Sequence, residues 1–534
     1  MKKFTFQQIE KKIKKLKTER STWENHWQEV ADYVLPRKNT ITTTRTEGEK
    51  RTWQLLDNTG MNSNELLAGS LHGMLTNPDL PWFEYTTGDL ALDADDEVKA
   101  WLQQAARVTH NVLNNSNFQT EVHELYLDLP SIGTACMFIE EDEKFVVRFS
   151  TKFIVDYYIE ENHLGVVDEV YREWKWNAAK IIAEFGMDNM PKKVLDAYKT
   201  GSDDKFCIYH AVYPKYLVEP KTKNLMDYIS QYFLEDGEKG LELSVGTYKE
   251  FPYVIPRWSK AAGEKYGRSP AMTALPELKV LNKMNETMLI GAQKLVDPPM
   301  QLPDDGYVLP LITKPGGINY YRAGTTDTAK TLFTDTRVDF GYQAMEDRRK
   351  RVKDAFYVDQ LKLQQGGPTM TATEVLQRTE ESMRLLGPML GRMQSEFLRP
   401  LIDRVFRIIY DRGLIPVPPQ SIQGRKIDVR YSSLIAKSQR VNEAQSILRV
   451  IQSAAPFLQI DPQVAQNFNG DNVVRLLAGV YGAPAEMLNT TKQVDSMRQA
   501  QAQAQQQAQQ MMMQQGQIDN SLTLAKAAKQ AQGV

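Results

Sequence analysis

The sequence predicts an α+β fold that is mainly helical, and three observations support this class. Apolar residues recur at intervals of three or four over several long stretches, as on the buried face of amphipathic helices. Between residues 130 and 260, short apolar runs bounded by turn residues predict strands instead. With 42% apolar and 25% charged residues among 534, the composition is that of a globular protein with room for several domains.

The longest helical pattern covers residues 340–413 and is divided by a Gly-Pro-rich break at 364–368. After the break, residues 371–374 have the spacing of a capping box, so a long helix is expected to begin near Thr371. Gly387-Pro388 predicts a kink in that helix, because proline lacks the amide that would bond four residues back. The pattern fits one bent helix or several docked ones, and it also fits two ordinary core helices joined by a loop.

Upstream, residues 4–35 predict an amphipathic helix that ends before Pro36. Its five lysines between positions 11 and 17 could form a nucleic-acid site, but we interpret them as a solvated face. Further helices are predicted over 62–76, 94–114, 118–129 and 178–185, with a short strand over 80–85.

The strand-rich segment from 130 to 260 is interpreted as a small antiparallel sheet or barrel inside a helical chain. A helix over 272–295, a Gly- and Pro-containing hairpin-like insert over 300–337 and a helix over 339–362 are expected to follow. The remaining predictions are a strand over 426–431, helices over 437–454 and 471–481, and a Gln-rich end that fits either a helix or a frayed tail.

The charge balance excludes a global basic field of the kind that marks many nucleic-acid binders. Lysine and arginine total 65 against 67 acidic residues, a net charge of −2, so any DNA contact is expected to be local or weak. Cys136 and Cys207 lie in apolar runs and are expected to be buried thiols. No run of about 18 apolar residues and no signal-peptide pattern occur, so residence in a cytosol is expected.

Catalytic motifs are missing from the sequence. The six histidines have no metalloprotease spacing, no phosphate-binding Gly-x-x-x-x-Gly-Lys-Ser/Thr stretch occurs, and no Gly-x-Ser-x-Gly nucleophile motif is found. Acidic pairs such as Asp95-Asp96 fall in polar loops, where a turn role is the simpler interpretation. The sequence therefore predicts no enzyme, no metal and no cofactor, and a chain of this size without such a site favours a role in structure or assembly.

Five motifs occur in a fixed order. They are Arg-Thr-Trp-Gln-Leu-Leu-Asp at 51–57, Gly-Ser-Leu-His-Gly-Met-Leu-Thr-Asn-Pro at 69–78 with Pro81-Trp82-Phe83, Tyr-Gly-Arg-Ser-Pro at 266–270 with Leu275-Pro276, Met-Thr-Ala-Thr-Glu-Val at 370–375, and Leu-Gly-Pro-Met-Leu-Gly at 386–391 with Phe397. Together they resemble the head-to-tail connector (portal) proteins of short-tailed, podovirus-type bacteriophages, and the resemblance covers nearly the whole chain.

The resemblance implies a portal-type, ring-forming fold divided into named regions. These would be a wing at 1–265 with its β-rich part at about 130–260, a first stem helix at 266–296, a clip at 297–337, a second stem helix at 338–362, a tunnel loop at 363–370, a long bent wing helix at 371–413, a crown at 414–490, and a Gln-rich helix or disordered tail at 491–534.

The resemblance also implies a function and a set of partners. The chain would form a homo-oligomer, typically a dodecamer, at one capsid vertex of the virion, assembled in the bacterial cytoplasm, through which double-stranded DNA is packaged and ejected. Its partners would be the major capsid protein, the scaffolding protein, the terminase large subunit, the tail adaptor and internal core proteins, with no membrane. The alternative is another multimeric assembly protein, such as a tail-tube or scaffold component, or a host binding platform.

The densest basic cluster lies on the predicted helix 339–362 and is the candidate DNA contact. We hypothesise that part of the set Arg348, Arg349, Lys350, Arg351 and Lys353, with Lys362, faces DNA phosphates in the channel. These residues cannot share one helix face, so some must bridge to acids of a neighbouring subunit, and such bridges alone are the alternative. The residues expected to form a movable tunnel loop are Gln364, Gln365, Gly366, Gly367 and Pro368, with the helix kink at Gly387 and Pro388.

Overall fold

The computed structural model describes residues 2–46, 48–52, 54–93, 95–219, 227–237, 240–302, 310–312, 318–320, 323–324, 330–331, 338–358, 386–431, 446–454, 469–480, 487–489, 491, 493–507 and 510–511. The chain divides into two compact units: Met1–Leu80 with Thr109–Arg412, called unit 1, and Pro81–Val108 with Gly413–Val534, called unit 2. The ranges expected from the sequence did not divide the chain this way, because they kept residues 1–265 together.

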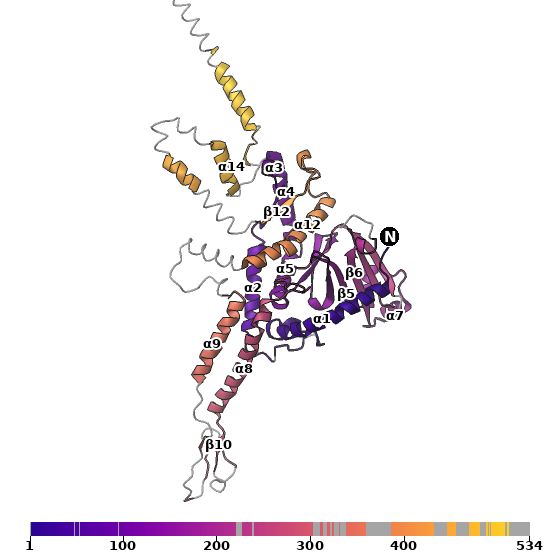
Figure 1. Ribbon diagram of the computed structural model, residues 1–534, viewed down its shortest axis with the longest axis vertical. Helices are drawn as coiled ribbons and strands as arrows, with labels where there is room; N and C mark the ends of the chain where they lie inside the picture. Colours follow the sequence, from indigo (N-terminus) through magenta and orange to yellow (C-terminus); the bar gives the residue numbers. More distant parts are fainter. Residues whose placement is uncertain are drawn as a thin grey trace, which may run out of the picture. The chain divides into compact units, whose positions relative to one another are not determined.

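A five-stranded antiparallel sheet is the largest sheet of unit 1 (Figure 1). Each strand pairs with the next in the chain, in the order β4-β5-β6-β7-β8. The strands are β4 (Tyr157–Glu161), β5 (Val167–Asn177), β6 (Lys205–Pro214), β7 (Tyr228–Leu234) and β8 (Leu241–Tyr248). The antiparallel sheet predicted between residues 130 and 260 is therefore confirmed.

The two faces of this sheet are covered by different helices, because successive side chains of a strand point to opposite sides. Cys207 and Tyr209 of β6 pack with helix α1 (Phe6–Val34), whose residues Phe6 and Ile9 are buried against the same face. Ile208 packs on the other face with α6 (Ala178–Phe185) and α7 (Lys192–Thr200). Both cysteines are free and buried, as expected.

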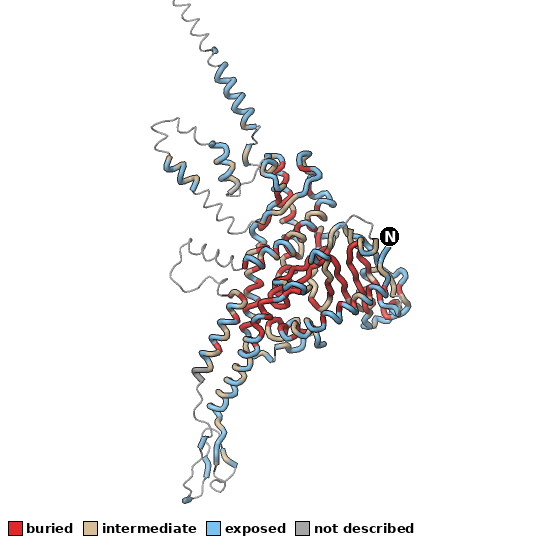
Figure 2. Tube along the Cα trace, viewed as in Figure 1, coloured by how far each residue is buried: buried red, intermediate tan, exposed pale blue. Residues whose placement is uncertain are grey.

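A second, three-stranded sheet and the helices α2 and α5 complete the body of unit 1. The sheet has the order β3-β2-β9, with β2 (Cys136–Asp142), β3 (Val146–Lys152) and β9 (Tyr253–Val254). Helix α2 (Thr59–Leu75) packs on α5 (Phe118–Ile132), and short 3-10 turns lie at Pro36–Lys38, Ile154–Asp156 and Lys215–Leu217. Figure 2 shows that buried residues concentrate in this body.

A helical hairpin extends from the body of unit 1 (Figure 1). It consists of α8 (Pro270–Val296) and α9 (Val338–Ala355), and the small strands β10 (Met300–Gln301) and β11 (Lys330–Thr331) pair between them. The two helices approach closely at Gly341, where an added Cβ would collide with the sulfur of Met288. Of the predicted insert at 300–337, residues 300–302, 310–312, 318–320, 323–324 and 330–331 are described.

Helix α9 is shorter than the sequence predicts. The predicted helix over 339–362 was wrong in its extent, because α9 ends at Ala355 and Tyr357 takes a left-handed conformation with φ 58°. Burial of Phe356 and Val358 on either side offsets the cost of this conformation, which is uncommon for a bulky residue. Lys362, the predicted tunnel loop at 363–370 and the capping box at 371–374 lie outside the described residues.

The last long helix of unit 1 is described from residue 386 to Asp411 and is called the terminal helix. Gly387 and Pro388 are helical and exposed, and the kink predicted there stays a prediction because the preceding turn is outside the described residues. An irregular turn lies further on, where Gln394–Leu398 forms a π-helix before α12 (Arg399–Asp411). Pro400 has no amide to bond back, and the wider turn accommodates this loss.

Unit 2 is built from two pieces of chain that are far apart in the sequence. Strand β1 (Phe83–Thr86) pairs with β12 (Asp428–Tyr431), and the indole of Trp101 donates to the carbonyl of Pro416 at 2.8 Å. The other named elements that begin here are α3 (Leu90–Asp93), α4 (Asp96–Asn115), the 3-10 turn Gln420–Ile422 and α14 (Gly470–Val480). No helix in the described part of the chain is long and apolar enough to span a membrane.

Candidate functional site

Three arginines of the basic cluster on α9 are paired with acids of the same chain. The Nη1 atom of Arg348 donates to Glu277 on α8 at 2.5 Å, and Nη1 of Arg351 reaches the other oxygen of Glu277 at 3.4 Å. Arg349 lies on a different side of α9, where its Nε donates to Asp57 at 2.9 Å. These residues therefore hold α9 against α8 and against the segment that leads into α2.

Electrostatics agree with this pairing. The hydrogen bond from Arg348 lowers the pKa of Glu277 below its ordinary value, with a smaller effect from Arg351. Burial alone would raise the pKa of Asp57, but hydrogen bonds from Thr59 and Arg349 outweigh it and lower the pKa. Acids of a neighbouring subunit were expected to take up part of the basic cluster, and for these three arginines the acids come from within the chain.

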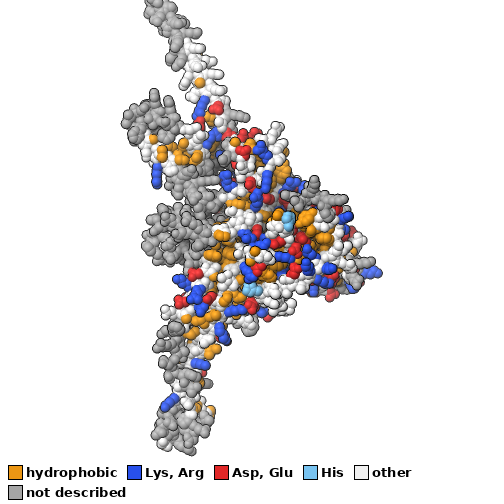
Figure 3. Space-filling view, in the orientation of Figure 1, with side chains coloured by type: hydrophobic (Ala, Val, Ile, Leu, Met, Phe, Trp, Pro, Cys, Tyr) orange, Lys and Arg blue, Asp and Glu red, His pale blue; other side chains and the backbone are white. Residues whose placement is uncertain are grey.

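The two lysines of the cluster are placed differently. Within the described residues, neither Lys350 nor Lys353 forms an ion pair, and Lys350 is exposed while Lys353 is half-buried. Lys350 stands three residues after Asp347 and four before Asp354, so acidic side chains flank it on the same helix surface. Figure 3 shows acidic and basic side chains intermixed where the hairpin joins the body. DNA contact by this cluster stays a prediction.

The hairpin also exposes large apolar side chains. On α8 they are Val280 (41% exposed), Leu289 (51%), Ile290 (45%), Leu295 (43%) and Val296 (88%), and on α9 Tyr342 (55%). At 100° per residue, those of α8 point in several directions and do not form one stripe facing α9. Two helices alone cannot bury such a surface, which is typical of a contact face for another protein chain.

At its base the hairpin is fixed to the body by the loop 255–269, called the junction. Ser269 caps α8: its hydroxyl accepts from the amide of Met272 at 3.1 Å and donates to the carbonyl of Ser131 at 2.7 Å. Pro270 follows at the first turn of the helix, where its missing amide costs nothing. The motif at 266–270 is thus a helix start that is tied to the end of α5.

Two glycines meet back to back at the junction. A Cβ added at Gly267 would collide with the carbonyl oxygen of Gly133, and one added at Gly133 would collide with the carbonyl oxygen of Gly267. Gly133 also has φ +87°, a backbone conformation that is unfavourable for residues with a Cβ. The amide of Gly267 donates to the hydroxyl of Thr134 at 2.8 Å. Only glycine at both positions lets the junction approach the body this closely.

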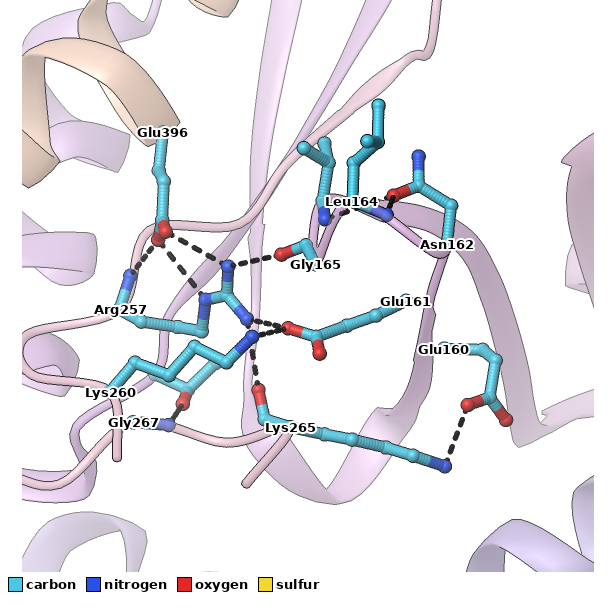
Figure 4. A network of polar contacts seen from close by, with 12 residues as sticks. Glu160, Glu161, Asn162, Leu164, Gly165, Arg257, Lys260, Lys265, Gly267 and Glu396 are labelled. Carbon is cyan, nitrogen blue, oxygen red and sulfur yellow. Dashed lines mark hydrogen bonds and ion pairs between the residues drawn. The ribbon is translucent and has the colours of Figure 1, made fainter. Parts of the chain in front are cut away.

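Arg257 is the centre of a buried polar network in the junction (Figure 4). Its side chain is 3% exposed and forms ion pairs with Glu161 at the end of β4 and with Glu396 in the π-helical turn. All five of its N–H groups are used: the remaining acceptors are the backbone carbonyls of Lys265 and Gly165. Its own amide also donates to Glu396, at 3.0 Å.

Further charges balance this network. Lys260 pairs with Glu161, Arg392 donates to Glu396 at 3.0 Å, and Lys265 pairs with Glu160 at 2.7 Å. Burial alone would lower the pKa of Arg257, but hydrogen bonds and charge from Glu396 and Glu161 raise it above the ordinary value. The guanidinium therefore remains charged, and the junction, the end of β4 and the terminal helix meet at it.

This network was not predicted from the sequence. Arg257, Glu161 and Glu396 are far apart along the chain, and no local pattern marks any of them as a partner of the others. The only signal nearby was the motif at 266–270, which ends the same loop.

The described residues contain no group of three or more His, Cys, Asp or Glu side chains that could hold a metal ion. Burial raises the pKa of the Cys136 thiol to about 12 and that of Cys207 to about 11, so neither supplies a thiolate near neutral pH. What the geometry provides is an anchored helical hairpin with a charge-balanced base and apolar flanks.

Comparison with known proteins identifies the family. The model of the family "Bacteriophage head to tail connecting protein" matches residues 6–488. The chain is 32% identical to the probable portal protein of Bordetella phage BPP-1, over 91% of this chain and 89% of the relative, and 26% identical to the portal protein of Salmonella phage epsilon15, over 97% and 94%. A solved neck of an empty GTA particle aligns with 84% of this chain and 98% of its own at 12% identity, with a TM-score of 0.38, too low to define a fold. The chain belongs to the family of bacteriophage head-to-tail connecting proteins.

Proposed function

We propose that the chain is the subunit of a phage portal, a ring of about twelve copies at one capsid vertex through which double-stranded DNA enters and leaves the head. Membership of the head-to-tail connecting family supports this role, as do the names of the two relatives. In this role α8 and α9 belong to the stem, the insert between them to the clip, the loop at 363–370 to the tunnel, and residues 371–413 and 414–490 to the long wing helix and the crown.

The observation that carries ring formation is the apolar surface of the hairpin. Exposed side chains such as Leu289, Ile290 and Val296 point in several directions, so the hairpin needs neighbours on more than one side. A closed ring supplies a neighbour on each flank through one heterologous contact. The capsid and scaffolding proteins would surround such a ring, and the clip would receive the terminase large subunit and later the tail adaptor.

Contact with DNA is assigned to the lysines of α9 rather than to its arginines. Arg348, Arg349 and Arg351 have acids within the chain, whereas Lys350 and Lys353 have no described ion pair. A ring repeats each residue around its axis, so two lysines per chain would form a belt that contacts phosphates without reading bases. The flanking acids Asp347 and Asp354 keep that belt weak, which suits a conduit that must let DNA pass.

The first test is the native mass and the end-on image of the purified chain. A ring with a central hole near ~0.7 MDa, twelve times the 61.0 kDa chain, is expected. A chain that stays monomeric also in the presence of capsid and scaffolding proteins would favour a different assembly protein.

The second test compares two double variants in a packaging reaction. Lys350→Ala/Lys353→Ala should form rings and unfold at the wild-type temperature, yet retain less DNA. The difference from wild type should shrink as salt rises, because salt weakens the phosphate contacts that only the wild type makes. Arg348→Ala/Arg351→Ala is the matched control, since it removes the same charge from the same helix but should mainly loosen α9. Wild-type DNA retention by the lysine variant contradicts the assignment.

The tunnel loop is tested by deleting residues 365–368. Rings should still form, because the described contacts of α9 and of the terminal helix do not involve the deleted residues, but packaging should fall. Packaging at the wild-type level by the deleted chain rules out a working role for this loop.

A further inference from the structure

We propose that Arg257 is a positioning residue that couples the terminal helix to the base of the α8–α9 hairpin, so that the two move as one body. Nothing in the family match or in the relatives' names assigns a role to this residue. The proposal concerns the described residues on both sides of the coupling: the junction 255–269, the end of α9 and the terminal helix.

Arg257 and Glu396 are joined by several hydrogen bonds. Arg257 contacts Glu396 through its backbone amide, through Nε at 3.1 Å and through Nη2 at 2.9 Å, so three donors hold one carboxylate. A two-pronged guanidinium–carboxylate contact fixes direction as well as distance. Because the amide is included, the backbone of the junction, and not merely a side chain, is tied to the terminal helix.

The next residue, Trp258, lies beside the end of α9. Trp258 is buried, its amide donates to the carbonyl of Gly133 at 2.9 Å, and its ring lies 6.4 Å from that of Tyr357. Tyr357 is the left-handed residue just after α9. Two consecutive residues of the junction therefore reach the terminal helix on one side and the end of α9 on the other.

Glu396 lies in the π-helical turn of the terminal helix. In this turn the amide of Arg399 bonds to the carbonyl of Gln394, one residue further than in an α-helix. The wider turn lets Phe397 and Leu398 remain buried while Glu396 reaches Arg257. Phe397 packs edge-on against Tyr126 of α5, with ring centroids 5.9 Å apart, so the turn is held at two points.

Buried ion pairs add little net stability compared with apolar side chains of the same shape, and their best-attested use is to specify one arrangement. A guanidinium that satisfies three separate segments with all its donors fits such a use. Under the proposed portal function, on which this consequence rests, a push on the hairpin by passing DNA would also displace the terminal helix.

The test measures amide hydrogen exchange of the full chain in three variants. Glu396→Gln removes the charge that joins Arg257 to the terminal helix and should speed exchange in residues 399–411 by about tenfold or more, together with the last turns of α9. Glu161→Gln removes the other carboxylate from the same guanidinium, and Arg392→Gln removes the other cation from Glu396. Both controls should leave exchange in 399–411 within about twofold of wild type.

Equal acceleration of residues 399–411 in all three variants would show a general loss of stability and overturn the coupling, as would no change in Glu396→Gln. Should Glu396→Gln fail to fold, Glu396→Asp keeps the charge but shortens the reach, and the same pattern is expected of it. Arg257→Lys should also speed exchange in residues 399–411, because an ammonium keeps the charge but cannot make the forked contact with Glu396. These readouts need no ring or DNA, so they fail or succeed separately from the portal proposal.

Discussion

Two groups of ion pairs in unit 1 differ in how far they are buried: the network around Arg257 in the junction and the arginines of α9. Arg257 in the junction is 3% exposed and has every donor satisfied, whereas Arg351 on the hairpin is 63% exposed and shares Glu277 with Arg348. Water screens the second cluster and is excluded from the first. The number of ion pairs therefore does not rank the two regions, because the pairs of the junction are buried with every donor satisfied and those of the hairpin are partly exposed.

The largest expected effect breaks the junction itself. Gly267→Ala places a Cβ against the carbonyl oxygen of Gly133, where neither backbone can yield, and should destabilise unit 1 by about 3 kcal/mol or more. Thermal unfolding of the purified chain measures this. Gly73→Ala is the control, because nothing lies within 4 Å of its added Cβ and the same change in α2 should stabilise by ~0.5–1 kcal/mol. A wild-type unfolding temperature for Gly267→Ala would show that the close approach is not required.

The next effect is a pH dependence of stability caused by Asp128, a buried carboxyl in the body of unit 1. Burial raises the pKa of the Asp128 carboxyl to about 6, although Lys38 donates to it at 2.6 Å. The folded state therefore binds a proton more tightly than the unfolded chain, whose carboxyl has an ordinary pKa near 3.8. The stability that this proton contributes is present below about pH 4 and is lost as pH rises to about 6, by about 3 kcal/mol.

Asp128→Asn removes this titration while keeping the size of the side chain. The unfolding free energy of wild type minus that of the variant should fall between pH 4 and pH 6, as measured by urea unfolding at several pH values. A difference that does not change over this range contradicts a raised pKa for Asp128.

The smallest effect concerns the hairpin. Glu277→Gln removes the acid shared by Arg348 and Arg351, and because these groups are partly exposed the loss should be about 1 kcal/mol and smaller at high salt. Glu286→Gln on the same helix is the control: its pair with Lys283 is exposed on both sides and should contribute nothing measurable. If Glu277→Gln costs as much as the junction variant, the contrast between the two regions is lost.

Local elements were predictable where the pattern is strong. Helix α6 has the predicted bounds Ala178–Phe185, and α1 and α8 differ from prediction by a few residues, because their apolar spacing and caps are encoded locally. Helix α7 (Lys192–Thr200) was missed, since only Val194 and Ala197 of its short length are buried and the periodicity is weak. Tyr357 ended α9 early by a conformation that no local rule assigns to tyrosine.

Contacts between distant segments were not predictable. The basic residues of α9 were identified correctly as a cluster, but nothing in their neighbourhood indicates that Glu277 and Asp57 lie beside them. Likewise, the pairing of β1 with β12 and the meeting of Glu161 with Glu396 at Arg257 depend on the folded chain as a whole. One sequence supplies the residue types, and only the tertiary structure shows which of them are neutralised.

The pairing of β1 with β12 has a consequence for biosynthesis. Strand β1 leaves the ribosome several hundred residues before its partner Asp428–Tyr431. Trp101 is likewise made several hundred residues before Pro416. At roughly 5–20 residues per second, the delay is on the order of tens of seconds. During that time the nascent segment 81–108 has an unpaired strand and an unfilled indole contact. A chaperone that covers this segment during synthesis would shield its unpaired strand until residues 428–431 are made.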